Sequence, residues 1–229
     1  MPASDTDSEL LLRWRSGDGR AGEELFSRYF EPIERFFLNK INDNIDDLLQ
    51  ETFLRCVQSR DRVVEPKKFR SYLFAIAFNV LANHLREKYR RGDEVDFENT
   101  SIFDLSPGPS SIAARRDEER LLLDALRVIP LQYQVIIELY YWESMTSREI
   151  ADVLSIPSGT ARTRLQRARA LLEEAIGKLG RTPQLTATTN THLDEWAEGC
   201  RLRLNVKQTE ENNDAEEIEN AEDDLSNFG

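Results

Sequence analysis

The sequence is poor in the residues that build metal sites, disulfide frameworks and membrane spans. It has two cysteines and two histidines among 229 residues, too few for a four-ligand zinc site without carboxylates and too few for a disulfide scaffold. No run of about 18 apolar residues exists, so we expect no membrane insertion. The N-terminus, MPASDTDSEL, lacks an apolar signal core, so we expect no export and a cytoplasmic, reduced setting.

The patterns typical of enzymes are also missing. The sequence contains no phosphate-binding glycine loop, no His and Cys close together, and no ligand spacing suited to a metal. We therefore predict a protein that is not an enzyme, with no catalytic residues, no metal and no cofactor.

Charge is unevenly distributed along the chain. The net charge is −12, but residues 181–229 alone carry −8. Residues 66–91 hold seven basic residues against one acid, and residues 158–170 hold four arginines and no acid. Such local clusters decide attraction to phosphate, although each could also be a solvated helix face.

Helical periodicity and breaks in composition predict an all-α protein of two small domains joined by a flexible linker. The predicted order is a first helical domain, a linker rich in Gly, Pro and Ser, a second helical domain and a C-terminal extension: 8–92, 93–115, 116–179 and 180–229. Within the extension we expect a short helix at 191–206, with Cys200 on its apolar face, followed by an acidic, disordered tail.

The second domain shows the pattern of a helix-turn-helix. Thr146 and Glu149 fit a capping box that begins a short helix, and the Ser-Ile-Pro segment 155–157 predicts a tight turn after it. Ser158 is expected to cap the next helix. The apolar residues of that helix share one face: Ala161, Leu165, Ala168, Leu172 and Ile176. The opposite face suits a DNA major groove and carries Arg162, Thr163, Gln166 and Arg167, flanked by Arg164 and Arg169. The alternative is a helical hairpin with a solvated basic face.

Two further helices are informative in the first domain. In INDNIDDLLQETFLRCV, the expected buried stripe is Ile45, Leu49, Phe53 and Cys56, which makes Cys56 a packed thiol. The residues that point elsewhere are Asp47, Gln50, Glu51 and Leu54, an acidic face that could dock a basic partner or simply be solvated.

The following helix, FRSYLFAIAFNVLANHLREKYRR, mixes aromatic and basic residues as single-stranded nucleic-acid binders do. The aromatic residues are Phe69, Tyr72, Phe74, Phe78 and Tyr89, of which Phe74 and Phe78 are expected in the core. Asn79 and Asn83 offer donors and acceptors to unpaired bases, whereas His84 shares the apolar face and is expected to be packed.

Taken together, these motifs resemble bacterial RNA polymerase sigma factors of the extracytoplasmic-function (ECF) group of the sigma-70 family. The resemblance rests on DDLLQETFLR, on the helix from Phe69 and on IPSGTARTRLQRARALL, in this order and spacing. It covers 8–92 as region 2 and 116–179 as region 4. The group more often has glycine where Ser155 stands and valine where Ala161 stands.

The resemblance implies roles for individual residues. The helix that binds the β′ clamp helices of the polymerase would contribute Asp47, Gln50, Glu51 and Phe53. Binding and capture of the −10 element would use Tyr72, Asn79, Asn83, Arg86, Lys88, Arg90 and Arg91. Recognition of the −35 element would use Ser158, Thr160, Arg162, Thr163, Arg164, Gln166 and Arg167.

The implied partners are core RNA polymerase, through its β′ clamp helices and β flap, and promoter DNA. Two routes of regulation stay open: an anti-sigma factor, or residues 180–229 acting in cis. The rival interpretation is a stand-alone helix-turn-helix regulator, which leaves the aromatic and basic helix of the first domain unexplained.

Overall fold

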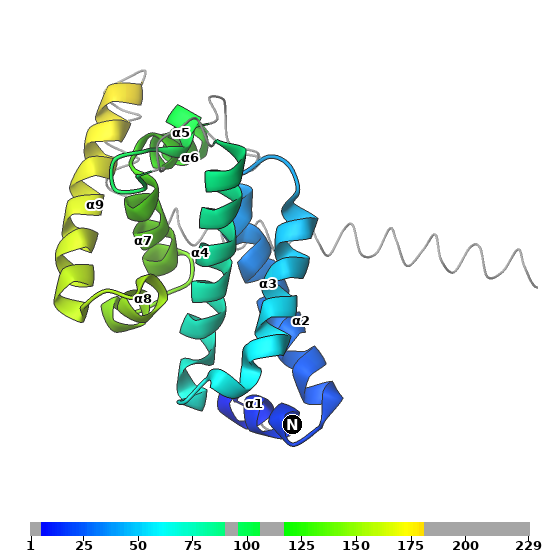
Figure 1. Cartoon of the computed structure of the whole chain (residues 1–229). Coiled ribbons are helices and arrows are strands. Elements are labelled where there is room, and N and C mark those ends of the chain that lie inside the picture. Colours follow the sequence, from blue (N-terminus) through cyan, green and yellow to red (C-terminus); the bar gives the residue numbers. More distant parts are fainter. Residues whose placement is uncertain (1–5, 90–95, 106–116, 181–229) are drawn as a thin grey trace, which may run out of the picture.

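A computed structural model describes residues 6–89, 96–105 and 117–180 (Figure 1). Within these ranges the ordered structure is helical, apart from an isolated bridge between Ser101 and Pro130. The α-helices are α1 (Asp7–Arg15), α2 (Gly19–Leu38), α3 (Ile45–Ser59), α4 (Phe69–Lys88), α5 (Ile102–Leu105), α6 (Asp117–Val128), α7 (Leu131–Tyr141), α8 (Ser147–Leu154) and α9 (Ser158–Leu179). Two 3₁₀ turns, η1 (Arg60–Arg62) and η2 (Pro66–Lys68), connect α3 to α4.

Helices α1 to α4 pack around an aromatic cluster. The ring of Phe36 meets those of Phe37 and Phe74 edge to face, with centroids 5.5 and 5.9 Å apart. Phe69 is also fully buried, which corrects our expectation that it could stack on nucleic acid. Burying an aliphatic or aromatic side chain of this size contributes about 1.5–3 kcal/mol, so this cluster is a main source of stability for the four helices.

The buried face of α3 differs from the predicted stripe. Leu49 and Cys56 are buried as expected, but Ile45 and Phe53 are only half-buried. Leu48 and Thr52 are buried as well, because α3 packs against both α2 and α4 and so buries a strip wider than a single stripe. Burial raises the pKa of the Cys56 thiol to about 12, as fits a packed, unreactive side chain.

Helices α8 and α9 form the predicted helix-turn-helix. The Thr146 hydroxyl accepts a hydrogen bond from the Glu149 amide, and the Glu149 carboxylate accepts one from the Thr146 amide at 2.8 Å. Ser155 ends α8 in the left-handed conformation, with φ 53° and ψ 43°. Our expectation for Ser158 is wrong: it is the first residue of α9, and Pro157 takes the N-cap position because its φ of −61° and ψ of 144° supply the extended backbone needed there.

The two groups of helices pack against each other through α4 and α8 (Figure 1). At this contact the Arg70 guanidinium lies 3.0 Å from the Glu149 carboxylate, and the Lys68 ammonium lies 3.4 Å from the Asp152 carboxylate. Partial burial would raise the pKa of Glu149, but the hydrogen bonds from Thr146 and the charge of Arg70 outweigh it and hold this pKa below 4.5.

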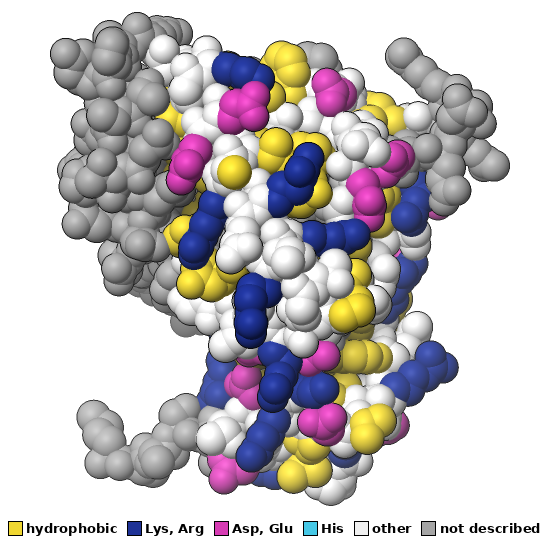
Figure 2. All heavy atoms as spheres, turned by 90° about the vertical axis from the view of Figure 1, so that its left-hand side faces the viewer, with side chains coloured by type: hydrophobic (Ala, Val, Ile, Leu, Met, Phe, Trp, Pro, Cys, Tyr) yellow, Lys and Arg dark blue, Asp and Glu magenta, His cyan; other side chains and the backbone are white. Residues whose placement is uncertain are grey.

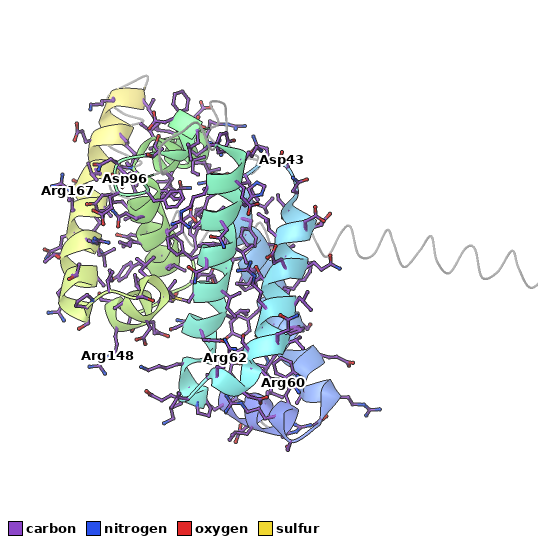
Figure 3. The ribbon with its side chains drawn as sticks, in the orientation of Figure 1. Asp43, Arg60, Arg62, Asp96, Arg148 and Arg167 are labelled. Carbon is purple, nitrogen blue, oxygen red and sulfur yellow. The ribbon has the colours of Figure 1, made fainter. Side chains whose placement is uncertain are left out.

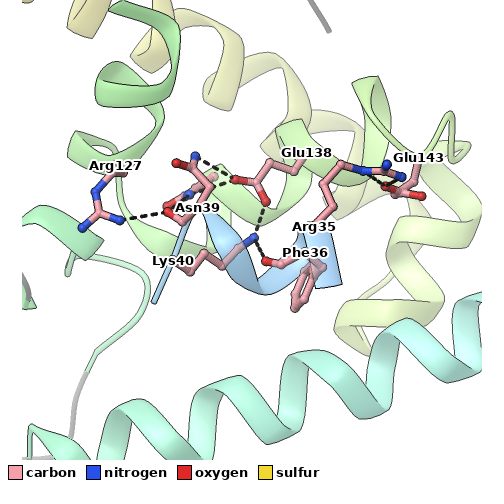
Figure 4. Close-up of polar contacts among 8 residues, drawn as sticks. Arg35, Phe36, Asn39, Lys40, Arg127, Glu138 and Glu143 are labelled. Atoms are coloured by element: carbon pink, nitrogen blue, oxygen red, sulfur yellow. Dashed lines mark hydrogen bonds and ion pairs between the residues drawn. The ribbon is translucent and has the colours of Figure 1, made fainter. Parts of the chain in front are cut away.

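A buried polar cluster also joins the C-terminal end of α2 to α6 and α7 (Figure 4). Its members are Arg35, Asn39, Lys40, Arg127, Gln134, Glu138 and Glu143. Lys40 is 1% exposed and Glu138 2%, and the Lys40 ammonium donates a hydrogen bond to the Glu138 carboxylate. The other carboxylate oxygen accepts from Gln134 at 2.8 Å and from Asn39 at 3.3 Å. The pKa of Lys40 is lowered by its burial, and the charge of Glu138 acts in the opposite sense.

Part of the expected linker is folded. Residues 96–105 form a turn and the short helix α5, in which Ile102 is fully buried and α5 packs against α6. Several expectations lie outside the described residues: Arg90, Arg91, the helix at 191–206 with Cys200, and the acidic tail.

Candidate promoter and polymerase interfaces

The outer face of α9 presents the polar residues that the sequence pattern placed there. Arg162, Thr163, Gln166 and Arg167 are all exposed. The residues of the opposite stripe, Ala161 to Ile176, are buried against the other helices. Arg167 points away from the body of the protein (Figure 3), and basic side chains are spaced along this face (Figure 2). The face therefore has the donors that contact base edges and phosphates, with no described helix covering it.

The flanking residues of α9 have partners within the protein. Arg164 is half-buried and donates to Gln132 at 2.5 Å and to Glu98 at 2.7 Å. Its guanidinium therefore ties α9 to the folded part of the linker in this arrangement. Among the other positions predicted for the −35 element, Ser158 is exposed and Thr160 is half-buried in the first turn of α9.

A cavity of about 290 Å³ lies between the end of α3 and the middle of α4. Its lining residues come from α3, η1 and α4: Arg55, Gln58, Ser59, Arg62, Tyr72, Ile76 and Asn79. Tyr72 and Asn79 were predicted to act on the −10 element, and the structure brings them together. The cavity combines an aromatic ring, an amide and two guanidinium groups, a set that can stack on a base, hydrogen-bond its edge and attract its phosphate.

The other residues predicted for the −10 element lie further along α4. Asn83 and Arg86 are exposed, and Arg86 donates to Asn83 at 3.2 Å while its guanidinium lies 5.0 Å from the Phe97 ring. Lys88 bonds both oxygens of Asp43 at 2.6 and 2.8 Å, and these bonds lower the pKa of Asp43. The two asparagines therefore do not share one pocket, since only Asn79 lines the cavity.

The acidic face of α3 is open, as predicted. Asp47, Gln50 and Glu51 are exposed, and Leu54 beside them is 53% exposed. Phe53 is half-buried, and its ring stacks on that of Phe30 of α2, with centroids 6.2 Å apart and planes 3° apart.

Sequence reasoning missed one member of this surface. Phe30 is 44% exposed and extends the apolar part of the surface from α3 onto α2. Nothing in the periodicity of α2 distinguishes it from a core phenylalanine, so only the packing of the two helices reveals it.

Comparison with known proteins agrees with this arrangement. The family model "Sigma-70 region 2" matches residues 25–91, and "Sigma-70, region 4" matches residues 119–172. The RNA polymerase sigma factor CarQ of Myxococcus xanthus is 30% identical over 172 residues, which cover 74% of this chain and 97% of CarQ. The chain belongs to the ECF group of the sigma-70 family. Sigma factors of this family are non-enzymatic initiation factors that bind core RNA polymerase and promoter DNA, and this one directs promoter recognition through regions 2 and 4.

A second relative matches most of this sigma factor. The ECF RNA polymerase sigma-E factor of Haemophilus influenzae is 28% identical over 183 residues, which span 76% of this chain and 97% of that protein. The match to region 2 sets aside the stand-alone helix-turn-helix regulator. Among the described residues, no helix has the length and apolar character needed to cross a membrane.

Solved structures share the fold of this sigma factor. CnrH in complex with the cytosolic domain of CnrY matches with a TM-score of 0.54 at 24% identity, over 76% of this chain and 99% of that chain. The sigma factor RpoE of Bartonella quintana, in complex with the anti-sigma factor NepR, matches with a TM-score of 0.53 at 18% identity, over 69% and 98%.

Proposed function

We propose that the exposed face of α9 reads the −35 element of the promoters that this sigma factor recognises. The observation that supports this is the clean division of α9 into a buried apolar stripe and an exposed face of Arg162, Thr163, Gln166 and Arg167. Arginine pairs with guanine and glutamine with adenine in the major groove. Ser158 and Thr160 lie at the start of the same helix, where backbone amides and hydroxyls suit phosphate contacts.

The cavity beside α4 is proposed to hold an unpaired base of the −10 element. Tyr72 supplies a ring for stacking, Asn79 supplies the amide for base recognition, and Arg62 supplies charge, whereas the Arg55 guanidinium lies 2.5 Å from the Glu51 carboxylate. Asn83, Arg86 and Lys88 continue the polar path along α4 and contact the backbone of the same strand. Arg90 and Arg91, which lie outside the described residues, are proposed to do the same. The proposed boundaries of this domain remain 8–92, with the second domain at 116–179.

The acidic face of α3 is proposed to bind the polymerase clamp. Asp47 and Glu51 provide negative charge for a basic partner, and Gln50 provides an amide for hydrogen bonds. The stacked pair of Phe53 and Phe30 provides an exposed apolar centre that a bound partner would desolvate, and interfaces gain most of their affinity from such centres. We place the factor in the cytoplasm, where polymerase and promoter DNA are found.

Binding to a promoter requires the two regions to separate. The −10 and −35 elements are about 25 base pairs apart, or roughly 85 Å of duplex at 3.4 Å per pair. In the structure, Arg70 of α4 lies 3.0 Å from Glu149 of α8, so the two DNA-binding regions are in contact. We propose that this closed arrangement belongs to the free factor. Of the two fold neighbours, CnrH is in complex with the cytosolic domain of CnrY and RpoE is in complex with the anti-sigma factor NepR. An anti-sigma factor that stabilises a closed arrangement fits this picture.

Run-off transcription with purified core polymerase tests the −35 assignment. On promoters selected from a random pool, Arg167→Ala should cost about 1–3 kcal/mol at one base position of the −35 element and leave other positions unchanged. The matched control is Lys178→Ala, which removes an exposed charge from the last turn of the same helix. An equal loss on every −35 variant would show that the assigned face does not read sequence.

Templates that are already melted test the −10 assignment. Asn79→Ala and Tyr72→Ala should reduce initiation on duplex templates, and a pre-melted −10 region should restore part of it. Loss of the same size on melted and duplex templates would contradict a role in strand capture.

A further inference from the structure

Helix α1 precedes the part of the chain that matches region 2, which begins at residue 25. It nevertheless contacts the connection between α3 and α4, the segment that contributes one wall of the cavity beside α4. The position of α1 itself is well fixed. Asp7 at its start bonds the Tyr29 hydroxyl and lies 3.2 Å from the Arg28 guanidinium, both on α2.

Arg15, the last residue of α1, holds the backbone of this segment at two points. Its Nε and one Nη donate to the carbonyl oxygen of Arg60 at 3.1 and 2.6 Å, and the same Nη donates to the carbonyl oxygen of Val63 at 2.5 Å. The two carbonyls stand on either side of Arg62, whose side chain lines the cavity. The backbone that carries Arg62 is therefore fixed both before and after it.

A second contact from the same helix acts on the same segment. The guanidinium of Arg60 lies 5.2 Å from the centroid of the Trp14 ring, within range of a cation–π interaction. Trp14 reaches this place because α2 has a glycine opposite it: a Cβ at Gly22 would stand 2.6 Å from the Trp14 ring. Two neighbouring residues of α1 thus engage one short turn, which Figure 3 shows between α1 and the ends of α3 and α4.

The opposite wall of the cavity, on α4, is hydrogen-bonded to the residue that precedes η1. The Tyr72 hydroxyl donates to the carbonyl oxygen of Ser59 at 3.2 Å, the residue just before the turn. Arg15 and Tyr72 therefore hold adjacent peptides from different helices. Because a recognition pocket must keep its groups within about 0.5 Å of the productive geometry, loss of one anchor would loosen the wall that carries Arg62.

We infer that Arg15 is a positioning residue for base selection at the −10 element. It acts by holding the Arg60–Val63 backbone, and with it the Arg62 side chain, against the cavity. This inference rests on the proposed function of the cavity. It assigns Arg15 no contact with DNA: one Nη of its guanidinium bonds both main-chain carbonyls, and its Nε adds a second bond to the carbonyl of Arg60.

The test measures selectivity by the holoenzyme rather than activity alone. A promoter selected by the wild-type holoenzyme is compared with its single-base variants at each −10 position, by run-off transcription. We expect Arg15→Ala to reduce the ratio between the preferred base and the others about tenfold at one position, with the −35 preferences unchanged. Arg15→Lys should behave like Arg15→Ala, because its ammonium stands one bond short of the Nη that bonds both carbonyls and it also lacks the Nε bond to Arg60. The matched control, Arg20→Ala, removes an exposed arginine of α2 and should leave the ratio unchanged.

Three results would overturn the inference. The first is full selectivity in Arg15→Lys, which would mean that the reach of the guanidinium to the two carbonyls is not required. The second is an equal fall on every −10 variant with Arg15→Ala, which would mean a role in folding or polymerase binding. The third is an unchanged profile in Arg15→Ala while Tyr72→Ala and Asn79→Ala flatten theirs; the cavity would then keep its proposed function without Arg15. If none of these variants alters selectivity, the proposed function of the cavity itself fails. If Arg15→Ala does not fold, Arg15→Lys decides.

Discussion

Replacing Glu138 by Gln isolates the contribution of charge within the buried polar cluster. The amide oxygen of Gln can still accept from Gln134 and Asn39, so two hydrogen bonds of the cluster are kept. The Lys40 ammonium, 1% exposed, then loses its counter-charge. Breaking a buried ion pair by removing one partner costs about 3–5 kcal/mol.

The pKa of lysine sets an upper limit on this cost. In the variant, the buried Lys40 can release its proton and become neutral. At pH 7, deprotonating a lysine of pKa 10.4 costs about 1.36 kcal/mol for each of roughly 3.4 pH units, or nearly 5 kcal/mol. The loss of stability cannot exceed this amount. A folded-state pKa far below the unfolded one means that the unfolded chain binds more protons, so stability rises with pH up to that unfolded value. The deficit of Glu138→Gln relative to wild type should therefore shrink between pH 7 and pH 10.

Equilibrium urea denaturation at pH 7 and pH 10 measures this deficit. Fluorescence energy transfer between labels on α4 and α9 shows whether the two regions separate before the helices unfold. The control is Glu174→Gln, which breaks an exposed pair with Lys178 and should change the midpoint very little. A deficit below about 1 kcal/mol at pH 7, with unchanged energy transfer, would refute the idea that the Lys40–Glu138 pair holds the regions together.

Three further predictions follow from local geometry. Ser155→Gly should stabilise the protein by about 0.5–1 kcal/mol in thermal denaturation, because φ is 53° there and a Cβ is strained in that conformation; a lower midpoint would contradict this. The pKa of Glu149 is depressed, so its stabilising effect is complete above 4.5 and lost as the pH falls below that value; Glu149→Gln should remove this part of the acid dependence of the urea midpoint. Truncation after Gly180 should raise run-off transcription if the extension inhibits in cis, with a smaller gain at high salt, and unchanged activity would exclude inhibition.

Sequence patterns were sufficient for the helix-turn-helix because local and tertiary preferences agree there. The Thr146 capping box, the turn before Pro157 and the stripe from Ala161 all point to the same structure, and all three are present. The N-cap of α9 was predicted one position too late, at Ser158 and not at Pro157, because either a serine or a proline can occupy an N-cap and only the backbone distinguishes them.

The pattern of the first domain was less informative because its helices pack on several sides. Phe69 was expected beside nucleic acid and lies in the core, and Phe53 was expected in the stripe and is half-exposed. Such errors arise where a helix has two packing neighbours, since hydrophobic periodicity then no longer identifies one buried face.

The buried cluster could not be predicted from periodicity at all. Lys40 and Glu138 lie about a hundred positions apart, and each reads as an ordinary surface charge until the two regions are brought together. The one sequence signal is Glu138 within the apolar segment VIIELYY, where a lone carboxylate suggests a buried partner.

The chemistry of this interface suits the opening that we propose. An apolar interface between the two regions would expose hydrophobic surface on separation, a cost that rises with area. The contact seen here adds three ion pairs to the apolar packing that the regions share: Lys40 with Glu138, Arg35 with Glu143, and Arg70 with Glu149, whose charges would regain water on separation. Because buried ion pairs offset desolvation only when every partner is in place, they favour one docking geometry without making it very strong. This combination fits the proposed behaviour of the factor, closed when free and open on the polymerase.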